Sequence, residues 1–183
     1  MTIRQETTED INEVYVLHEV AFGQPQEANI VDKLRNNCEG LLSLVATENG
    51  KIVGHILFSP AEIEGPYGAI KGVGLAPMAV LPSMQRHGIG TQLINKGIEE
   101  LRRLQYPFII VLGHHEYYPH FGFERASLYG IKCQWDGIPD EAFMILWLDK
   151  SKAGQVSGVA KYREEFNTDF HRILSVIIIS AYI

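Results

Sequence analysis

A glycine-bearing turn constrains the fold of this chain more than any other segment. Its residues are Gln85, Arg86, His87, Gly88, Ile89, Gly90 and Thr91. The turn follows an apolar stretch that ends at Leu81 and precedes residues 89–104. In that range apolar residues recur every three or four positions, a pattern that predicts a core-facing helix. The first N–H groups of such a helix lack intrahelical partners and lie at the positive end of its dipole. The turn therefore predicts a binding site for phosphate or pyrophosphate.

The rest of the pattern predicts a mixed α/β sheet. Strands are expected over residues 3–5, 42–47, 52–58, 70–81, 108–112 and 143–148, and helices from 7 or 8 to about 22, 28–37, 89–104 and 117–121. Asn49-Gly50 is typical of a two-residue hairpin turn, and the strand after it is expected to end at Ser59-Pro60. Pro77 interrupts an otherwise apolar strand, which predicts a bulge just before the anion-binding turn.

Composition narrows the class of protein. The chain has 183 residues and a net charge of −6, which favours one domain and argues against a nucleic-acid surface. Its two cysteines have neither metal-ligand spacing nor the density of a disulfide scaffold, so we expect free thiols. The polar N-terminus is unlike a signal peptide, and the apolar end of the chain is shorter than a membrane span. A cytoplasmic protein without a membrane partner is the expectation.

Two common phosphate motifs do not fit the turn. A P-loop requires Gly-Lys-Ser/Thr at the start of its helix, and here Gly90 is followed by Thr91 with no lysine. A dinucleotide fingerprint requires a third glycine in GxGxxG spacing. The spacing that does fit is Gln/Arg-x-x-Gly-x-Gly/Ala, preceded by the strand Leu-Ala-Pro-Met-Ala-Val.

With these features the chain resembles the GNAT (Gcn5-related) N-acetyltransferases, and within them the YhbS-like branch. The resemblance rests on the turn, on a Tyr-x-x-x-Gly-Phe segment from Tyr118 to Phe123, and on the strand Gly54–Pro60, and it spans roughly residues 3 to 170. The branch often has Asp-Pro where this chain has His114-His115, and a basic residue at His120. The resemblance implies an α/β fold with a mixed, mostly antiparallel twisted sheet, helices on both faces and a splayed central strand pair. A single domain over residues 1–172 is expected, with 173–183 as an apolar extension that is compatible with a homodimer.

The resemblance also implies roles for individual residues. Main-chain groups of Met78, Ala79 and Val80 and of the turn from Gln85 to Thr91 would bind acetyl-coenzyme A as cosubstrate. Tyr118, whose reference pKa is about 10, would stay protonated and donate its proton to the departing thiolate. The alternative for Tyr118 is packing in an aromatic cluster with Tyr117, Phe121 and Phe123.

The general base is left open by the sequence. Candidates for the base or for the acceptor pocket are His55, Glu62, Glu64, His114 and Glu116. A solvated surface charge is the ordinary alternative for each glutamate, and a hydrogen-bonded core residue is the alternative for His55. Direct acetyl transfer needs no metal, and the histidine pair with His120 does not form a typical ligand set.

Together these observations predict an acetyl-CoA-dependent N-acetyltransferase. The acetyl group would pass directly to a primary amine on a small molecule or peptide. The rival prediction is a catalytically idle acyl-CoA-binding module that senses or regulates, because a fold does not determine an activity.

Overall fold

A twisted sheet forms the centre of the molecule in the computed structural model, which describes residues 1–66 and 68–167. Within those ranges the sheet has nine strands. They are β1 (Thr2–Gln5), β2 (Leu42–Glu48), β3 (Lys51–Gly65), β4 (Gly68–Val80), β5 (Phe108–Leu112), β6 (Glu124–Arg125), β7 (Ile131–Cys133), β8 (Phe143–Trp147) and β9 (Gly158–Lys161). The main path runs β1-β2-β3-β4-β5-β8-β6, while β9 pairs with both β3 and β7. The predicted extension over residues 173–183 lies outside the described residues.

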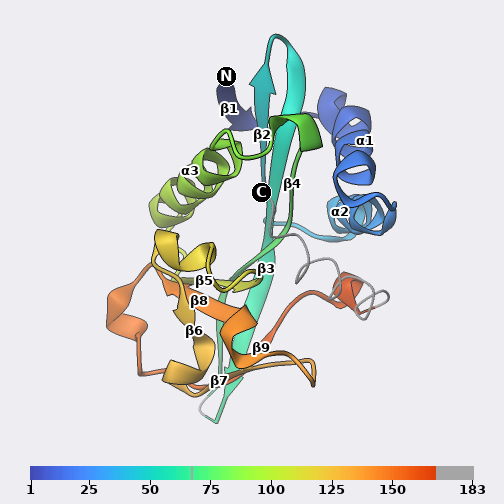
Figure 1. Cartoon of the computed structure of the whole chain (residues 1–183). Coiled ribbons are helices and arrows are strands. Elements are labelled where there is room, and N and C mark those ends of the chain that lie inside the picture. Colours follow the sequence, from blue (N-terminus) through green and yellow to red (C-terminus); the bar gives the residue numbers. More distant parts are fainter. Residues whose placement is uncertain (67, 168–183) are drawn as a thin grey trace.

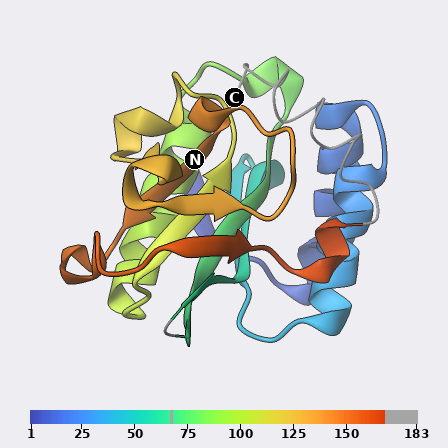
Figure 2. The same cartoon turned by 90° about the horizontal axis from the view of Figure 1, so that it is seen from below.

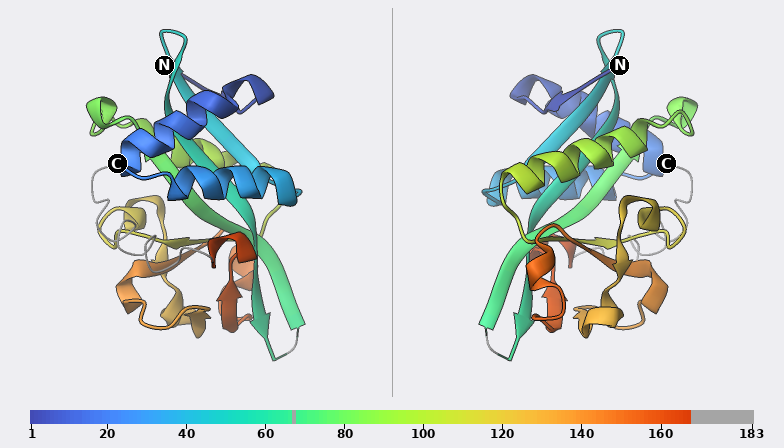
Figure 3. Two further views of the ribbon diagram at one scale, coloured as in Figure 1. Left: turned by 90° about the vertical axis from the view of Figure 1, so that its right-hand side faces the viewer. Right: turned by 90° about the vertical axis from the view of Figure 1, so that its left-hand side faces the viewer.

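Helices cover both faces of the sheet, as predicted. Helices α1 (Ile11–Phe22) and α2 (Gln26–Asn37) lie on one face, and α3 (Ile89–Arg103) lies on the other (Figure 3). The apolar stripe of α3 accounts for this placement, because Leu93, Ile94, Ile98 and Leu101 are all buried against the sheet. Each face therefore has its own hydrophobic cluster.

Local turn signals are confirmed. Gly23 ends α1 in the left-handed conformation with φ 68°, and its N–H donates to the carbonyl of Glu19. Asn49 and Gly50 have φ values of 52° and 76°, as a type I′ hairpin turn between β2 and β3 requires.

The predicted end of one strand at Ser59-Pro60 is wrong. Strand β3 continues through Pro60 to Gly65, and Pro60 pairs with Val73 of β4. On the other edge of β3, the pairing with β2 ends at Phe58 and the pairing with β9 begins at Glu62. Pro60 thus occupies the gap between two neighbours on that edge, where a missing N–H donor interrupts no ladder.

The central strand pair is splayed, as predicted. Strands β4 and β5 are parallel and pair at only three positions, the last of which joins Leu75 to Val111. Beyond that point β4 continues to Val80 while β5 ends at Leu112. A register shift between β3 and β4 falls opposite residues 76–77, which confirms the irregularity expected at Pro77.

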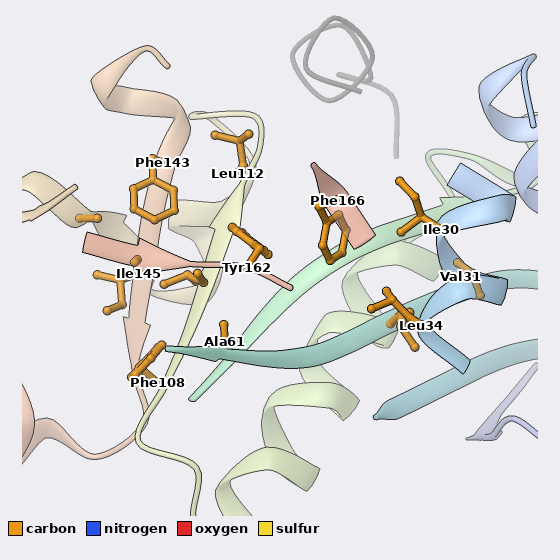
Figure 4. Packing of buried hydrophobic residues seen from close by; sticks show 14 of the residues in the cluster. Ile30, Val31, Leu34, Ala61, Phe108, Leu112, Phe143, Ile145, Tyr162 and Phe166 are labelled. Carbon is orange, nitrogen blue, oxygen red and sulfur yellow. The ribbon is translucent and has the colours of Figure 1, made fainter. Parts of the chain in front are cut away.

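The last described segment folds back onto the middle of the sheet. Strand β9 runs beside β7 on the side that faces the viewer in Figure 2. The chain then places Tyr162 over β4, where a Cβ on Gly74 would lie 2.4 Å from a ring carbon of Tyr162, so glycine is required for this close approach. Figure 4 shows Tyr162 beside Phe166 and below Leu112, with the α2 residues Ile30 and Leu34 beyond Phe166.

Candidate functional site

The open side of β4 is the first component of the candidate site. From Met78 to Val80 the strand is paired with β3, since His55 lies opposite Ala79 and Gly54 opposite Val80. Within the described residues, its other edge forms no pairs with β5 along this stretch. Met78, Ala79 and Val80 therefore stand where backbone groups on one edge face a gap between strands.

The anion-binding turn follows this open edge directly. Arg86 and Gly88 adopt left-handed conformations with φ values of 62° and 77°, and α3 starts at the next residue. The first hydrogen bond of α3 runs from the N–H of Gln92 to the carbonyl of Gly88. The N–H groups of Ile89, Gly90 and Thr91 precede it, so they have no partner four residues back within the helix.

Side chains within the turn hold its shape. The Gln85 amide donates to the carbonyl of Val80 across 3.2 Å, and the His87 Nδ1 lies 2.8 Å from the carbonyl of Gln85. Ile89 and Gly90 are buried, whereas Arg86, His87, Gly88 and Thr91 are exposed. The structure thus places all seven predicted turn residues around the N-terminus of α3, which can bind an anion.

Tyr118 lies at the N-terminus of a 3₁₀ helix, Tyr118–Phe121, on the far side of the gap. The residue is 5% exposed and makes edge-to-face contacts with Tyr117 and Phe123. A Cβ on Gly113, the residue that follows β5, would lie only 2.3 Å from its ring. Burial raises the pKa of Tyr118 well above its ordinary value, so the hydroxyl remains protonated across the physiological range. Both the aromatic cluster and the proton donor that the sequence offered are compatible with this arrangement.

Tyr117 connects the same segment to the turn. Burial raises the pKa of its hydroxyl, and the Thr91 side chain beside it counteracts part of that effect. The proximity of Thr91 brings the first turn of α3 and the 3₁₀ helix to one place, although they are separated by the whole of α3 and β5.

The candidates for a general base differ in their surroundings. Glu62 is half-buried and lines a cavity of about 360 Å³ together with Lys71, Tyr162 and Glu164. His114 is half-buried and Glu116 is exposed, and the Glu116 N–H reaches His114 Nδ1 at 3.4 Å. Glu64 is instead paired with Lys161 at the surface.

His55 is the hydrogen-bonded core residue that the sequence offered as its alternative reading. Its side chain is fully buried, and both ring nitrogens have partners at 2.8 Å, His18 Nε2 and Ser43 Oγ. It does not line an open pocket in this structure. Sequence reasoning missed His18, although a histidine on the apolar stripe of α1, beside Val14 and Leu17, is a signal for a buried polar contact.

Among residues 1–66 and 68–167, no three His, Cys, Asp or Glu side chains are grouped as metal ligands would be. No helix within those same ranges has the length and apolar character to cross a bilayer. Cys38 and Cys133 are both free thiols.

The splayed parallel pair, the free N–H groups at the start of α3 and the buried tyrosine are the features expected of a protein that binds an acyl carrier with a phosphate group. Comparison with known sequences agrees, because the profile of the acetyltransferase (GNAT) domain matches residues 2–126. The uncharacterized N-acetyltransferase YhbS of Escherichia coli K12 is 33% identical over 168 residues, which cover 91% of this chain and 99% of the relative. The chain therefore belongs to the GNAT acetyltransferase family.

Solved structures give the same result. The crystal structure of Escherichia coli YhbS in complex with CoA superposes with a TM-score of 0.84 at 32% identity, covering 91% of both chains. A GNAT family acetyltransferase from Brucella melitensis, in complex with acetyl-CoA, superposes with a TM-score of 0.74 at 33% identity. That alignment covers 90% of this chain and 97% of the Brucella protein.

Proposed function

We propose that this protein transfers the acetyl group of acetyl-CoA directly to a primary amine within a ternary complex. The observation that carries the proposal is the divergence of β4 from β5 after Leu75, immediately before the anion-binding turn. The gap would accommodate an extended arm with amide groups, and the turn would accommodate a pyrophosphate. Two relatives of the same fold, each at least 32% identical, were solved with CoA or acetyl-CoA, which supports this donor.

The donor would be bound chiefly by main-chain groups. The N–H groups at the start of α3 would contact the pyrophosphate, while the open edge of β4 from Met78 to Val80 would pair with the pantetheine amides and polarise the acetyl carbonyl. Exposed Arg86 would add a charge-assisted contact to a phosphate.

The transfer step needs two proton movements. The amine nitrogen forms a bond to the carbonyl carbon, the carbon–sulfur bond breaks, and the thiolate takes a proton from Tyr118. The proton lost from the amine passes to a base directly or through water. Because His55 is sealed in the core, we place the base among Glu62, His114 and Glu116.

Substitution of Tyr118 by phenylalanine tests the proton donor. The Tyr118→Phe variant should lower kcat at least tenfold while the thermal stabilisation by acetyl-CoA stays within experimental error of the wild type. Tyr117→Phe is the matched control, since it removes a neighbouring hydroxyl from the same aromatic cluster, and it should change kcat less than threefold. Equal kinetics for Tyr118→Phe and the wild type would remove Tyr118 from the mechanism.

The rival function is distinguished by ligand binding and turnover. Thermal shift with acetyl-CoA, CoA, ATP and NAD reports which ligand binds, and thiol release against a panel of amines reports turnover. Stabilisation by CoA species without thiol release on any amine would favour an idle acyl-CoA-binding module. Stabilisation by ATP or NAD alone would contradict the assigned donor.

A further inference from the structure

A row of five polar side chains, two of them fully buried and three half-buried, joins α1 and α2 to the sheet. Arg35 on α2 pairs with Glu6, which follows β1, and Glu6 accepts a hydrogen bond from Ser43 on β2. Ser43 Oγ lies 2.8 Å from Nε2 of His55 on β3, and His55 Nδ1 lies 2.8 Å from Nε2 of His18 on α1. We call these five residues the buried row.

The protons of the buried row can be counted. Burial raises the pKa of Glu6, but His55 above all, and then Ser43 and Arg35, lower that pKa to about 2. The carboxylate therefore carries no proton, and Ser43 donates to it. The single hydrogen of Ser43 is then used, and the contact between Ser43 and His55 requires a hydrogen on His55 Nε2. His55 Nδ1 is consequently an acceptor, and His18 Nε2 must donate to it.

The last ring nitrogen of the row, His18 Nδ1, has no partner. It is buried, and the count leaves it unprotonated. Burial lowers the pKa of both imidazoles, and the charge of Arg35 acts in the same direction. Glu6 opposes this effect on His55, since its Oε2 lies 3.7 Å from His55 Nε2, but burial is the larger effect and the pKa of His55 stays below its ordinary value. Both histidines are therefore neutral, with their hydrogens on Nε2.

A proton added to either ring leaves a buried group without a partner. On His55 Nδ1 it would require His18 Nε2 to accept, which moves the hydrogen of His18 to Nδ1, where it has no partner. On His18 Nδ1 it would place an unpaired charge in a fully buried position. The neutral pair is therefore the most favourable state of the His18–His55 contact.

The position of this contact links it to the transfer site. His55 is paired with Ala79, in the open stretch of β4 proposed to hold the acetyl carbonyl. His18 stacks on Phe22, the last residue of α1, with ring centroids 5.8 Å apart and an interplanar angle of 9°. We propose, building on the function above, that His18 and His55 are positioning residues. They hold the last turn of α1 against β3, the strand paired with the proposed acetyl-bearing stretch of β4, and so shape the acceptor side of the site.

The proton count is tested on the wild-type protein without any substrate. Long-range ¹⁵N–¹H correlation spectra of histidine-labelled protein should show two rings as neutral Nε2–H tautomers from pH 8 to pH 6, and His18→Phe and His18→Gln should assign them. An Nδ1–H tautomer or a protonated ring for either residue at pH 7 would overturn the proposal.

The positioning role is tested with three variants and an amine that supports turnover. His18→Phe keeps the stack on Phe22 and loses the donor to His55, so it should raise the KM for the amine at least tenfold and leave that for acetyl-CoA within threefold. His18→Gln keeps an N–H donor near the position of Nε2 and should stay within threefold of the wild type. Val14→Ala is the matched control, since it loosens the same helix outside the buried row.

The matched control separates positioning from simple packing. An unchanged amine KM in His18→Phe, or an equal rise in the amine KM of Val14→Ala, would refute the positioning role.

If no amine supports turnover, the proposed function fails. Amide exchange then tests the role of His18, because His18→Phe should expose the last turn of α1 at least tenfold more than Val14→Ala, and equal exchange would overturn it. Should His18→Phe not fold, the wild-type spectra decide.

Discussion

Replacing Gly113 by alanine should damage catalysis through the ring of Tyr118. The added Cβ would lie 2.3, 2.9 and 3.2 Å from Cε2, Cδ2 and Cζ of that ring, whereas carbon atoms in contact prefer about 3.5–4.0 Å. Gly113 is not among the residues with positive φ, so alanine adopts its backbone conformation without strain and the effect is purely steric. The ring must therefore retreat by about 1 Å. Such overpacking destabilises a core by about 1–3 kcal/mol.

The kinetic consequence is larger than the loss of stability suggests. A displacement of about 1 Å in a catalytic group lowers a rate by roughly 100-fold, which corresponds to about 2.7 kcal/mol in the barrier. Gly113→Ala should thus lower kcat by roughly 100-fold, while the dissociation constant of acetyl-CoA changes less than threefold, since main-chain groups elsewhere bind the donor. Thiol release gives the first quantity and calorimetric titration the second.

Two controls isolate the cause. Gly72→Ala introduces a comparable clash, 2.6 Å from the ring of Phe108, so it should destabilise the protein similarly and leave kcat within threefold. In a Tyr118→Phe background, Gly113→Ala should lower kcat by less than threefold further, because the hydroxyl that it displaces is already absent. A full 100-fold loss in that background would refute the reasoning, as would an unaltered kcat in the single variant.

Two further predictions concern stability. Since burial lowers the folded-state pKa of His18 and of His55, the unfolded chain binds protons near pH 6.5 that the folded protein does not. The free energy of unfolding should be constant above about pH 7. Below that pH it should fall with a slope approaching about 2.7 kcal/mol per pH unit, because two histidines take up protons on unfolding. Urea titrations that show a flat profile down to about pH 5 would contradict this. Gly97→Ala in α3 would normally gain about 1 kcal/mol of helix propensity, but its Cβ would lie 2.4 Å from the ring of Phe58, so we expect a net loss of about 1–2 kcal/mol. An increase in the melting temperature would show that Phe58 moves aside freely.

Local sequence signals account for the elements that were predicted correctly. The left-handed conformations at Gly23, Asn49 and Gly88 depend on the residue itself and its immediate neighbours. The core-facing stripe of α3 likewise depends on spacing within one helix. For this reason the turn and the helix that follows it were placed correctly from the sequence.

Long-range contacts could not be predicted from the sequence. The continuation of β3 past Pro60 is made possible by β9, a strand that pairs with it from about a hundred positions later in the chain. The fit of Tyr162 over Gly74 and the contact between His18 and His55 are of the same kind. A glycine in a strand or a histidine on an apolar face signals that a partner is needed, but the residue that fills the place depends on the tertiary fold.

The difference in length between β4 and β5 explains why donor binding and catalysis should respond to different substitutions. Thirteen residues of β4 run beside five of β5, so one edge of β4 is left open while its other edge remains paired with β3 through Val80. Backbone groups on that edge and at the start of α3 are present whatever the side chains are, and donor binding should therefore tolerate side-chain changes that keep the strand and the turn. The proposed proton donation, by contrast, would depend on the single hydroxyl of Tyr118, whose ring packs directly against the Cα of Gly113. Substitutions at these two residues should lower turnover in a protein that still binds acetyl-CoA.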